Sequence, residues 1–76
     1  MKIVFVFRLK ELRQTKSLTQ LDVSSALKIS DRLYAYYESI NNLRMPSCHT
    51  LIKLANYFEV SIDFLLGRSD NPKINK

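Results

Sequence analysis

The chain has 76 residues, a formal net charge of +5 and one cysteine, Cys48. This length suffices for one small domain, which buries only about 60–65% of the surface of its unfolded form. An apolar share of 46% excludes a disordered protein, and a lone cysteine excludes an internal disulfide. No apolar run approaches the ~18 residues of a membrane span, and the run after Lys2 is too short for a signal peptide. We therefore expect a cytoplasmic protein.

The net positive charge is a weak indication of nucleic-acid binding. Much of it lies at the two ends of the chain, and residues 8–66 hold eight basic and six acidic side chains. Any argument for a DNA partner must therefore rest on the arrangement of particular residues. The single glycine and two prolines favour helices over a strand-and-turn fold.

The first helix is predicted at residues 8–15, where Leu9 and Leu12 lie three positions apart and Phe5 lies one turn earlier. After Lys2, residues 3–7 are apolar and rich in β-prone side chains. Two interpretations stay open for this segment. It caps the core, or it forms a short strand that pairs with its counterpart in a dimer, with Phe64 joining that interface.

The next two helices are short and close together. Thr19 is predicted to cap a helix that ends at Leu27, with Asp22 placed for a capping box. After a break at residues 28–30, Ser30 caps a helix from Asp31 to about Ser39. Tyr34 and Tyr37 are the expected inward pair of this helix.

The C-terminal half begins with a loop at residues 41–46, after which Ser47 caps a fourth helix. Apolar residues recur there with helical spacing at Leu51, Leu54, Ala55 and Phe58. Ser61 caps a fifth helix at residues 62–66, Gly67 ends it, and residues 68–76 are expected to fray. The chain is thus expected to be one all-α domain over residues 1–76, with its core at 8–67.

Two short helices joined by a three-residue turn, residues 19–39, form the unit that presents a helix to the DNA major groove. With Tyr34 and Tyr37 inward, the helix at 31–39 presents an opposite face. Arg32 on that face matches the O6 and N7 atoms of guanine, and Ala35 or Tyr36 can contact a thymine methyl group. Asp31 repels phosphate, so it faces a base donor such as cytosine N4 or stays at a distance. The outward face comprises Arg32, Ala35, Tyr36 and Ser39.

The order and spacing of several short runs resemble the phage lambda repressor/Cro family of Xre-type regulators. The resemblance extends from about Arg8 to Gly67. The matching runs are Arg8-Leu-Lys-Glu-Leu-Arg13, Leu18-Thr-Gln20, Tyr37-Glu38, Pro46-Ser47, Thr50-Leu-Ile-Lys-Leu-Ala55 and Val60-Ser-Ile-Asp-Phe-Leu-Leu66.

This resemblance implies a five-helix, lambda-repressor-like domain that dimerises on a palindromic operator in double-stranded DNA. It also implies that Gln20 holds a phosphate, that residues 30–36 read bases, and that the loop after Glu38 follows the DNA backbone. Arg13 and Glu38 would form an internal ion pair. The DNA-binding residues expected on these grounds are Gln20, Ser30, Asp31, Arg32, Ala35, Tyr36, Ser39, Asn41, Asn42 and Arg44.

Several features of the sequence depart from the family pattern. Ser24 stands where alanine is usual, and its hydroxyl is expected to bond the helix carbonyl four residues back. Lys28 stands where glycine is usual in a left-handed turn, at a cost of about 1–2 kcal/mol. Tyr34 replaces a branched aliphatic residue, so the core is repacked around a ring. The loop from Glu38 to Pro46 is longer than the common pattern.

The sequence favours a dimeric repressor of a phage, mobile-element or self-regulating operon, which occludes RNA polymerase. The alternative is an antitoxin-like interaction module that neutralises a partner through exposed Leu21 and Leu33 and regulates its own operon. Neither a nucleophile–base arrangement nor a glycine-rich phosphate loop is present, so we expect no enzyme, no cofactor and no small-molecule ligand. Adjacent Cys48 and His49 cannot complete a metal site, and Cys48 is expected to be a half-buried structural thiol.

Overall fold

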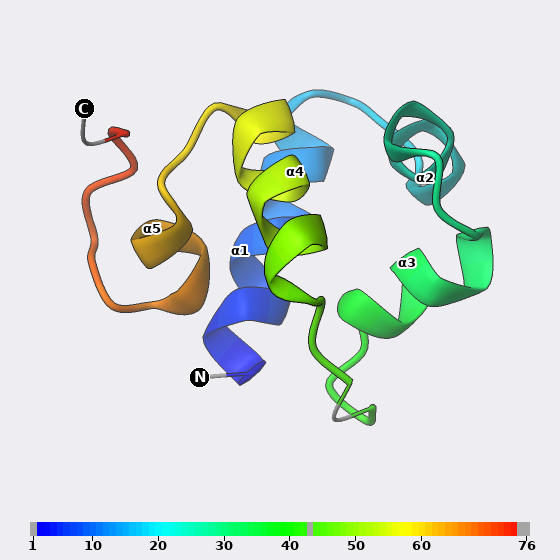
Figure 1. Cartoon of the computed structure of the whole chain (residues 1–76), viewed down its shortest axis with the longest axis horizontal. Helices are drawn as coiled ribbons and strands as arrows, with labels where there is room; N and C mark the ends of the chain where they lie inside the picture. The colour runs from blue at the N-terminus through cyan, green and yellow to red at the C-terminus, as the bar shows by residue number, and fades with distance from the viewer. Residues whose placement is uncertain (1, 43, 75–76) are drawn as a thin grey trace.

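A computed structural model describes residues 2–42 and 44–74, and within this part of the chain every regular element is an α-helix. Figure 1 shows α2 and α3 together at one end of the molecule, α5 at the other end, and α1 and α4 between them. The expected all-α, five-helix fold is confirmed. The helices are α1 Lys2–Thr15, α2 Gln20–Leu27, α3 Asp31–Tyr37, α4 Cys48–Phe58 and α5 Ile62–Leu66.

The four predicted helix caps are all present. The Thr19 hydroxyl accepts from the Asp22 N–H, and the Asp22 carboxylate accepts from the Thr19 N–H, which completes a capping box. Ser30, Ser47 and Ser61 each accept from the backbone N–H three residues on. These short side chains accept hydrogen bonds from N–H groups that have no partner within the helix at its start. The local sequence therefore determines where each of these helices begins.

The N-terminal segment does not form the strand considered above, because α1 is helical from Lys2. Phe5, Val6 and Leu9 are all buried, and their spacing is that of one face of a helix. Tertiary burial of that face therefore overrides the β-preference of the valines and phenylalanines. The same helical geometry leaves Ile3 and Phe7, one turn apart, about 60% exposed.

The core lies where α1, α4 and α5 meet the helix pair α2 and α3. It includes side chains with no exposed surface from each of the five helices: Phe5, Leu9, Val23, Tyr34, Leu54 and Leu65. Tyr34 and Tyr37 are both buried as expected, with their rings edge to face at a centroid distance of 6.5 Å. Leu33, expected to be exposed, packs partly buried against the same core.

The segment after α5 is held more firmly than expected. The Arg8 guanidinium donates to the carbonyl oxygens of Phe64 and Ser69 and to the Asp70 carboxylate, and it lies 4.1 Å from the centre of the Phe64 ring. The Ser61 N–H donates to the Pro72 carbonyl at 2.9 Å. Residues 69–72 therefore lie along the domain instead of fraying, while residues 75 and 76 fall outside the described part of the chain.

A further expectation concerns the exposure of Cys48. Cys48 is exposed at the first position of α4, so the prediction of a half-buried thiol was wrong. The cause is its place at the first position of α4, before the buried residues Leu54, Ala55 and Phe58. None of the helices among the described residues has the length and apolar character needed to cross a bilayer.

Candidate nucleic-acid interface

The turn between α2 and α3 sets the angle of the helix pair. Lys28 adopts the left-handed conformation expected for it, with φ 58° and ψ 44°. The Ile29 N–H donates to the Ser24 carbonyl at 3.0 Å, which closes the end of α2. The Lys53 ammonium of α4 donates to the Leu27 carbonyl at 3.2 Å. Lys53 therefore has a structural partner at the C-terminus of α2, where a cation also stabilises the helix dipole.

The end of α3 is anchored by one buried carboxylate, that of Glu38, whose side chain is 2% exposed. Arg13 of α1 binds it through two N–H groups, Nε at 2.7 Å and Nη2 at 3.0 Å. Tyr34 donates its hydroxyl at 2.5 Å, and Gln20 of α2 donates its amide at 3.2 Å. The Arg13–Glu38 pair is confirmed, and it joins α1, α2 and α3 in one network.

These contacts determine the ionisation of the Glu38 carboxyl group. Burial alone raises the pKa of Glu38, but the hydrogen bonds from Arg13, Tyr34 and Gln20 outweigh burial and bring the pKa below its ordinary value. Burial, and next the bond to the Glu38 carboxylate, raise the pKa of Tyr34. At neutral pH the network is therefore a carboxylate with only protonated donors around it, and it holds α3 in a fixed orientation.

The start of α3 carries a second contact to α2 that the sequence did not indicate. The Ser24 side chain is fully buried, and its hydroxyl oxygen lies 2.8 Å from Oδ1 of Asp31 and 3.1 Å from the Leu21 carbonyl oxygen. The hydroxyl has these two acceptors in place of the expected carbonyl four residues back. The nearer one is a carboxylate, and charge-assisted bonds are the stronger kind.

The outward side of α3 is less uniform than its helical periodicity predicted. Asp31 and Arg32, in the first turn, are exposed. Ala35, Tyr36 and Ser39 are half-buried, and the loop after α3 contacts Tyr36 through Arg44 and Ser39 through Asn41. The most accessible part of α3 is therefore its first turn, which is the part of a recognition helix that reaches base edges.

The Ser30 hydroxyl accepts from the Leu33 N–H and can still donate its own proton. Gln20, at the start of α2, is half-buried with its amide on Glu38.

The loop after α3 is shaped by its own polar side chains. The Asn42 side chain accepts from the Arg44 N–H at 2.8 Å, and the Ser39 hydroxyl accepts from the Asn41 N–H at 3.3 Å. The Arg44 guanidinium lies 5.4 Å from the centre of the Tyr36 ring, a cation–π distance that links the loop to α3. The structure thus brings Tyr36, Ser39, Asn41, Asn42 and Arg44 into one region beside α3.

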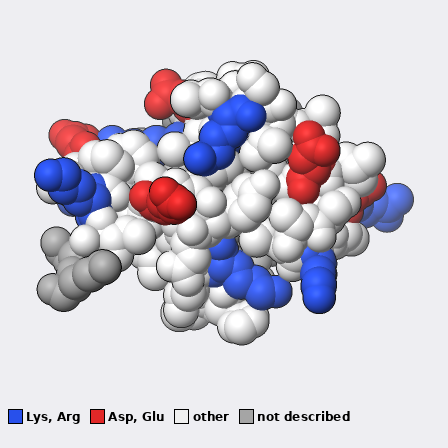
Figure 2. Space-filling view, turned by 90° about the horizontal axis from the view of Figure 1, so that it is seen from above, with Lys and Arg blue, Asp and Glu red and all other residues white. Residues whose placement is uncertain are grey.

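The surface charge of the domain bears on how it could bind DNA. Figure 2 shows basic and acidic side chains interspersed over the face that it presents, without a continuous basic patch. This agrees with the near balance of charges in residues 8–66. Recognition of DNA by this domain would depend on the placement of a few side chains more than on a strong general field.

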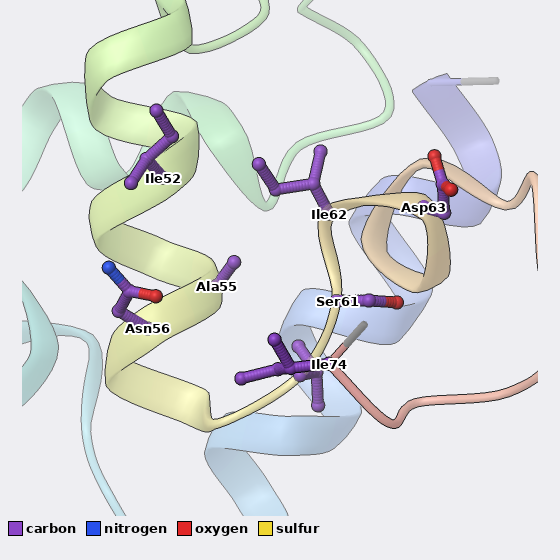
Figure 3. Close-up of a pocket in the computed structure, with 8 residues that line it drawn as sticks. Ile52, Ala55, Asn56, Ser61, Ile62, Asp63 and Ile74 are labelled. Atoms are coloured by element: carbon purple, nitrogen blue, oxygen red, sulfur yellow. The ribbon is translucent and has the colours of Figure 1, made fainter. Parts of the chain in front are cut away.

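A shallow pocket lies away from this region, where α4, α5 and the segment after α5 meet (Figure 3). Its lining is mostly aliphatic, with Ile52, Ile62 and Ile74 around it and Asn56, Ser61 and Asp63 at its polar side. Among the described residues, no group of three or more His, Cys, Asp or Glu side chains is arranged to hold a metal ion.

The fold and this arrangement define a helix-turn-helix DNA-binding domain. The family profile of the helix-turn-helix domain matches residues 7–70, and the chain belongs to that family. The resemblance to Xre-type regulators drawn from the sequence is confirmed. No solved structure gives a significant match.

Several curated proteins of Bacillus subtilis (strain 168) are similar to the chain. The HTH-type transcriptional regulator ImmR is 39% identical over 69 residues, which cover 91% of this chain and 53% of ImmR. The uncharacterized HTH-type transcriptional regulator YqaE is 37% identical over 71 residues, covering 93% and 60%. The HTH-type transcriptional regulator AnsR is 41% identical over 61 residues, covering 80% and 51%. The chain thus spans little more than half the length of these relatives.

Proposed function

We propose that the protein is a sequence-specific transcriptional repressor, which binds an operator in double-stranded DNA by placing α3 in the major groove. The observation that carries this proposal is the exposed first turn of α3, with Arg32 outward, on a helix held at its other end by the Glu38 network. A rigidly held helix with an exposed arginine can read guanine through a bidentate contact. The similar proteins named as transcriptional regulators support a role in transcriptional regulation.

In this proposal the residues near α3 have different tasks. Arg32 reads a base, with Ser30, Asp31 and Ala35 beside it in the groove. Gln20 and the loop side chains hold the phosphate backbone, and the Tyr36 ring supports the guanidinium of Arg44. The loop side chains are Ser39, Asn41, Asn42 and Arg44. The protein would act in the cytoplasm by binding alone, without catalysis, and would repress by occluding RNA polymerase.

Two substitutions test these roles. Arg32→Ala should weaken binding to the selected operator by about 1–3 kcal/mol and relax the preference at one base pair. Arg44→Ala should weaken binding to all sequences and reduce the salt slope by about one. Arg68→Ala is the matched control, because Arg68 is 68% exposed at the far end, near Asp63, and should change neither quantity. Equal losses on operator and random DNA for both Arg32→Ala and Arg44→Ala would refute the assignment.

We also propose that the chain binds a palindromic operator as a homodimer. Ile3 and Phe7, exposed one turn apart on α1, support an apolar contact between two copies. Sedimentation equilibrium at micromolar concentration should show a dimer for the unmodified chain and a monomer for the Ile3→Ser, Phe7→Ser double variant. Leu21→Ser, which removes an exposed side chain of α2, is the control. A double variant that remains dimeric would refute this interface.

A second candidate is the antitoxin-like module, in which an apolar surface binds a different protein. Leu21 is 56% exposed and supports it, whereas Leu33 packs against the core. A defined small protein encoded beside this one, forming a complex that the Leu21→Ser variant no longer forms, would establish this function. DNA binding would persist in that case as autoregulation.

A further inference from the structure

Ser24 and Asp31 form a contact that links the inner side of α2 to the first turn of α3. We propose that Ser24 is a positioning residue for DNA sequence recognition: its buried hydroxyl fixes the Asp31 carboxylate, which then selects an amino-bearing base, cytosine above all, at one operator position. This inference rests on the proposed DNA-binding function and names a specificity determinant within it.

The contact constrains Asp31 at one oxygen. Oδ1 lies 2.8 Å from the Ser24 hydroxyl, and Ser24 itself has no exposed surface. The serine is buried in the body of α2, so its hydroxyl has little room to follow a moving carboxylate. The second oxygen, Oδ2, belongs to a side chain that is exposed at the beginning of α3.

The chemistry of the carboxylate determines what it can select. An ionised carboxylate accepts hydrogen bonds and donates none. In the major groove, cytosine presents the N4 amino group and adenine the N6 amino group, whereas guanine O6 and N7 and thymine O4 are acceptors. Asp31 therefore attracts an amino-bearing base and repels the other two. An aspartate free to rotate would turn toward solvent when the unfavourable base is present, and it would discriminate less.

By holding the Asp31 carboxylate, Ser24 thus makes this negative charge contribute to sequence recognition. The charge of Asp31 repels phosphate and weakens binding to every sequence to a similar extent, whether the side chain is free or held. A carboxylate fixed beside α2 repels most strongly those sequences that place an acceptor opposite it. The difference between the two cases is measurable as a base preference.

The experiment compares four full-length variants in DNA selection at the base pair that depends on Asp31. We expect the unmodified protein to prefer cytosine there by about tenfold. Asp31→Ala should abolish the preference and increase affinity for random DNA. Asp31→Asn should shift the preference toward adenine, which asparagine pairs with through N6 and N7. Ser24→Ala should reduce the cytosine preference to about threefold or less, with the affinity for random DNA and the salt slope unchanged.

Ser25→Ala is the matched control, since Ser25 is exposed on the same helix and should leave the preference intact. Thermal unfolding separates positioning from stability: Ser24→Ala loses a bond to a carboxylate and should melt somewhat below the unmodified protein, and the base preference is measured well below that temperature, where both are folded. If Ser24→Ala retains the full preference, or Asp31→Ala does not alter it, this inference is wrong while the proposed function stands. If the unmodified protein prefers no sequence over random DNA, the proposed function fails, and this inference with it.

Discussion

Replacing Tyr34 by phenylalanine removes one hydroxyl from the network that orients α3 and leaves the buried ring in place. The hydroxyl donates to the Glu38 carboxylate at 2.5 Å in a fully buried position. A hydrogen bond to a charged group contributes about 1.5–3 kcal/mol to stability. Because Glu38 keeps both contacts with Arg13 and one with Gln20, the lower end applies. We expect Tyr34→Phe to lose about 1.5 kcal/mol, which lowers the melting temperature by about 6–12 °C for a domain of this size.

The loss should depend on pH in a defined direction. The folded-state pKa of Glu38 lies below its ordinary value, so the unfolded chain binds the proton first as pH falls. The stability that the carboxylate contributes is complete above the unfolded pKa and disappears as pH falls through the folded pKa. Tyr34 donates to the charged form, so the deficit of Tyr34→Phe should be full at pH 7. It should shrink as pH falls through the unfolded pKa, about 4.3 for glutamate, and toward the lower folded pKa.

Urea and thermal unfolding followed by circular dichroism measure both quantities. Tyr37→Phe is the control, because Tyr37 is also buried in α3, whereas the Glu38 carboxylate accepts from Arg13, Tyr34 and Gln20. Its loss should be smaller and should not follow the Glu38 titration. A Tyr34→Phe variant as stable as the unmodified protein at pH 7, or a deficit that persists unchanged at low pH, would refute the reasoning.

Three more substitutions test the local structure by the same unfolding assays. Arg13→Met leaves the Glu38 carboxylate buried without its cation and should cost about 3–5 kcal/mol, and a loss below 1 kcal/mol would contradict the buried pair. Lys28→Gly relieves a left-handed residue and should stabilise by about 0.5–1 kcal/mol, so a loss would mean that the turn is not strained. Gly67→Ala should cost about 1–2 kcal/mol in backbone strain at φ 79°. The loss of stability should be larger still, because the new Cβ would lie 2.7 Å from Val4 Cγ1. A neutral effect would exclude this contact.

The parts of the fold that the sequence predicted are those determined by local chemistry. Thr19, Ser30, Ser47 and Ser61 each cap the helix expected for them, because a cap needs only its own side chain and the next three residues. The left-handed conformation of Lys28 was predicted from the turn that the resemblance implies.

The parts that the sequence did not predict depend on contacts between distant residues. The extension of α1 to Lys2 follows from burial of Phe5 and Val6, which a β-prone composition conceals. The contacts of Arg8 with residues 64, 69 and 70 join the two ends of the domain, and no local pattern indicates them.

The candidate site divides in the same way. Arg32 was assigned an outward position from helical periodicity, and the structure leaves it exposed. Tyr36 and Arg44 were assigned separately, and their cation–π contact appears only once the loop is placed beside α3. The bond between Ser24 and Asp31 required the angle between α2 and α3, which the sequence specifies only through the whole core.

Selection of bound DNA from a random pool, performed at two salt concentrations, tests the central claim most directly. If α3 reads the major groove in a two-fold dimer, the selected sequences should contain two related half-sites whose centres lie about 34–36 Å apart, or roughly 10 base pairs. Their advantage over the unselected pool should persist at the higher salt, where contacts to phosphate alone weaken. Recovery of no sequence preference at either salt concentration would contradict the claim that this domain reads an operator.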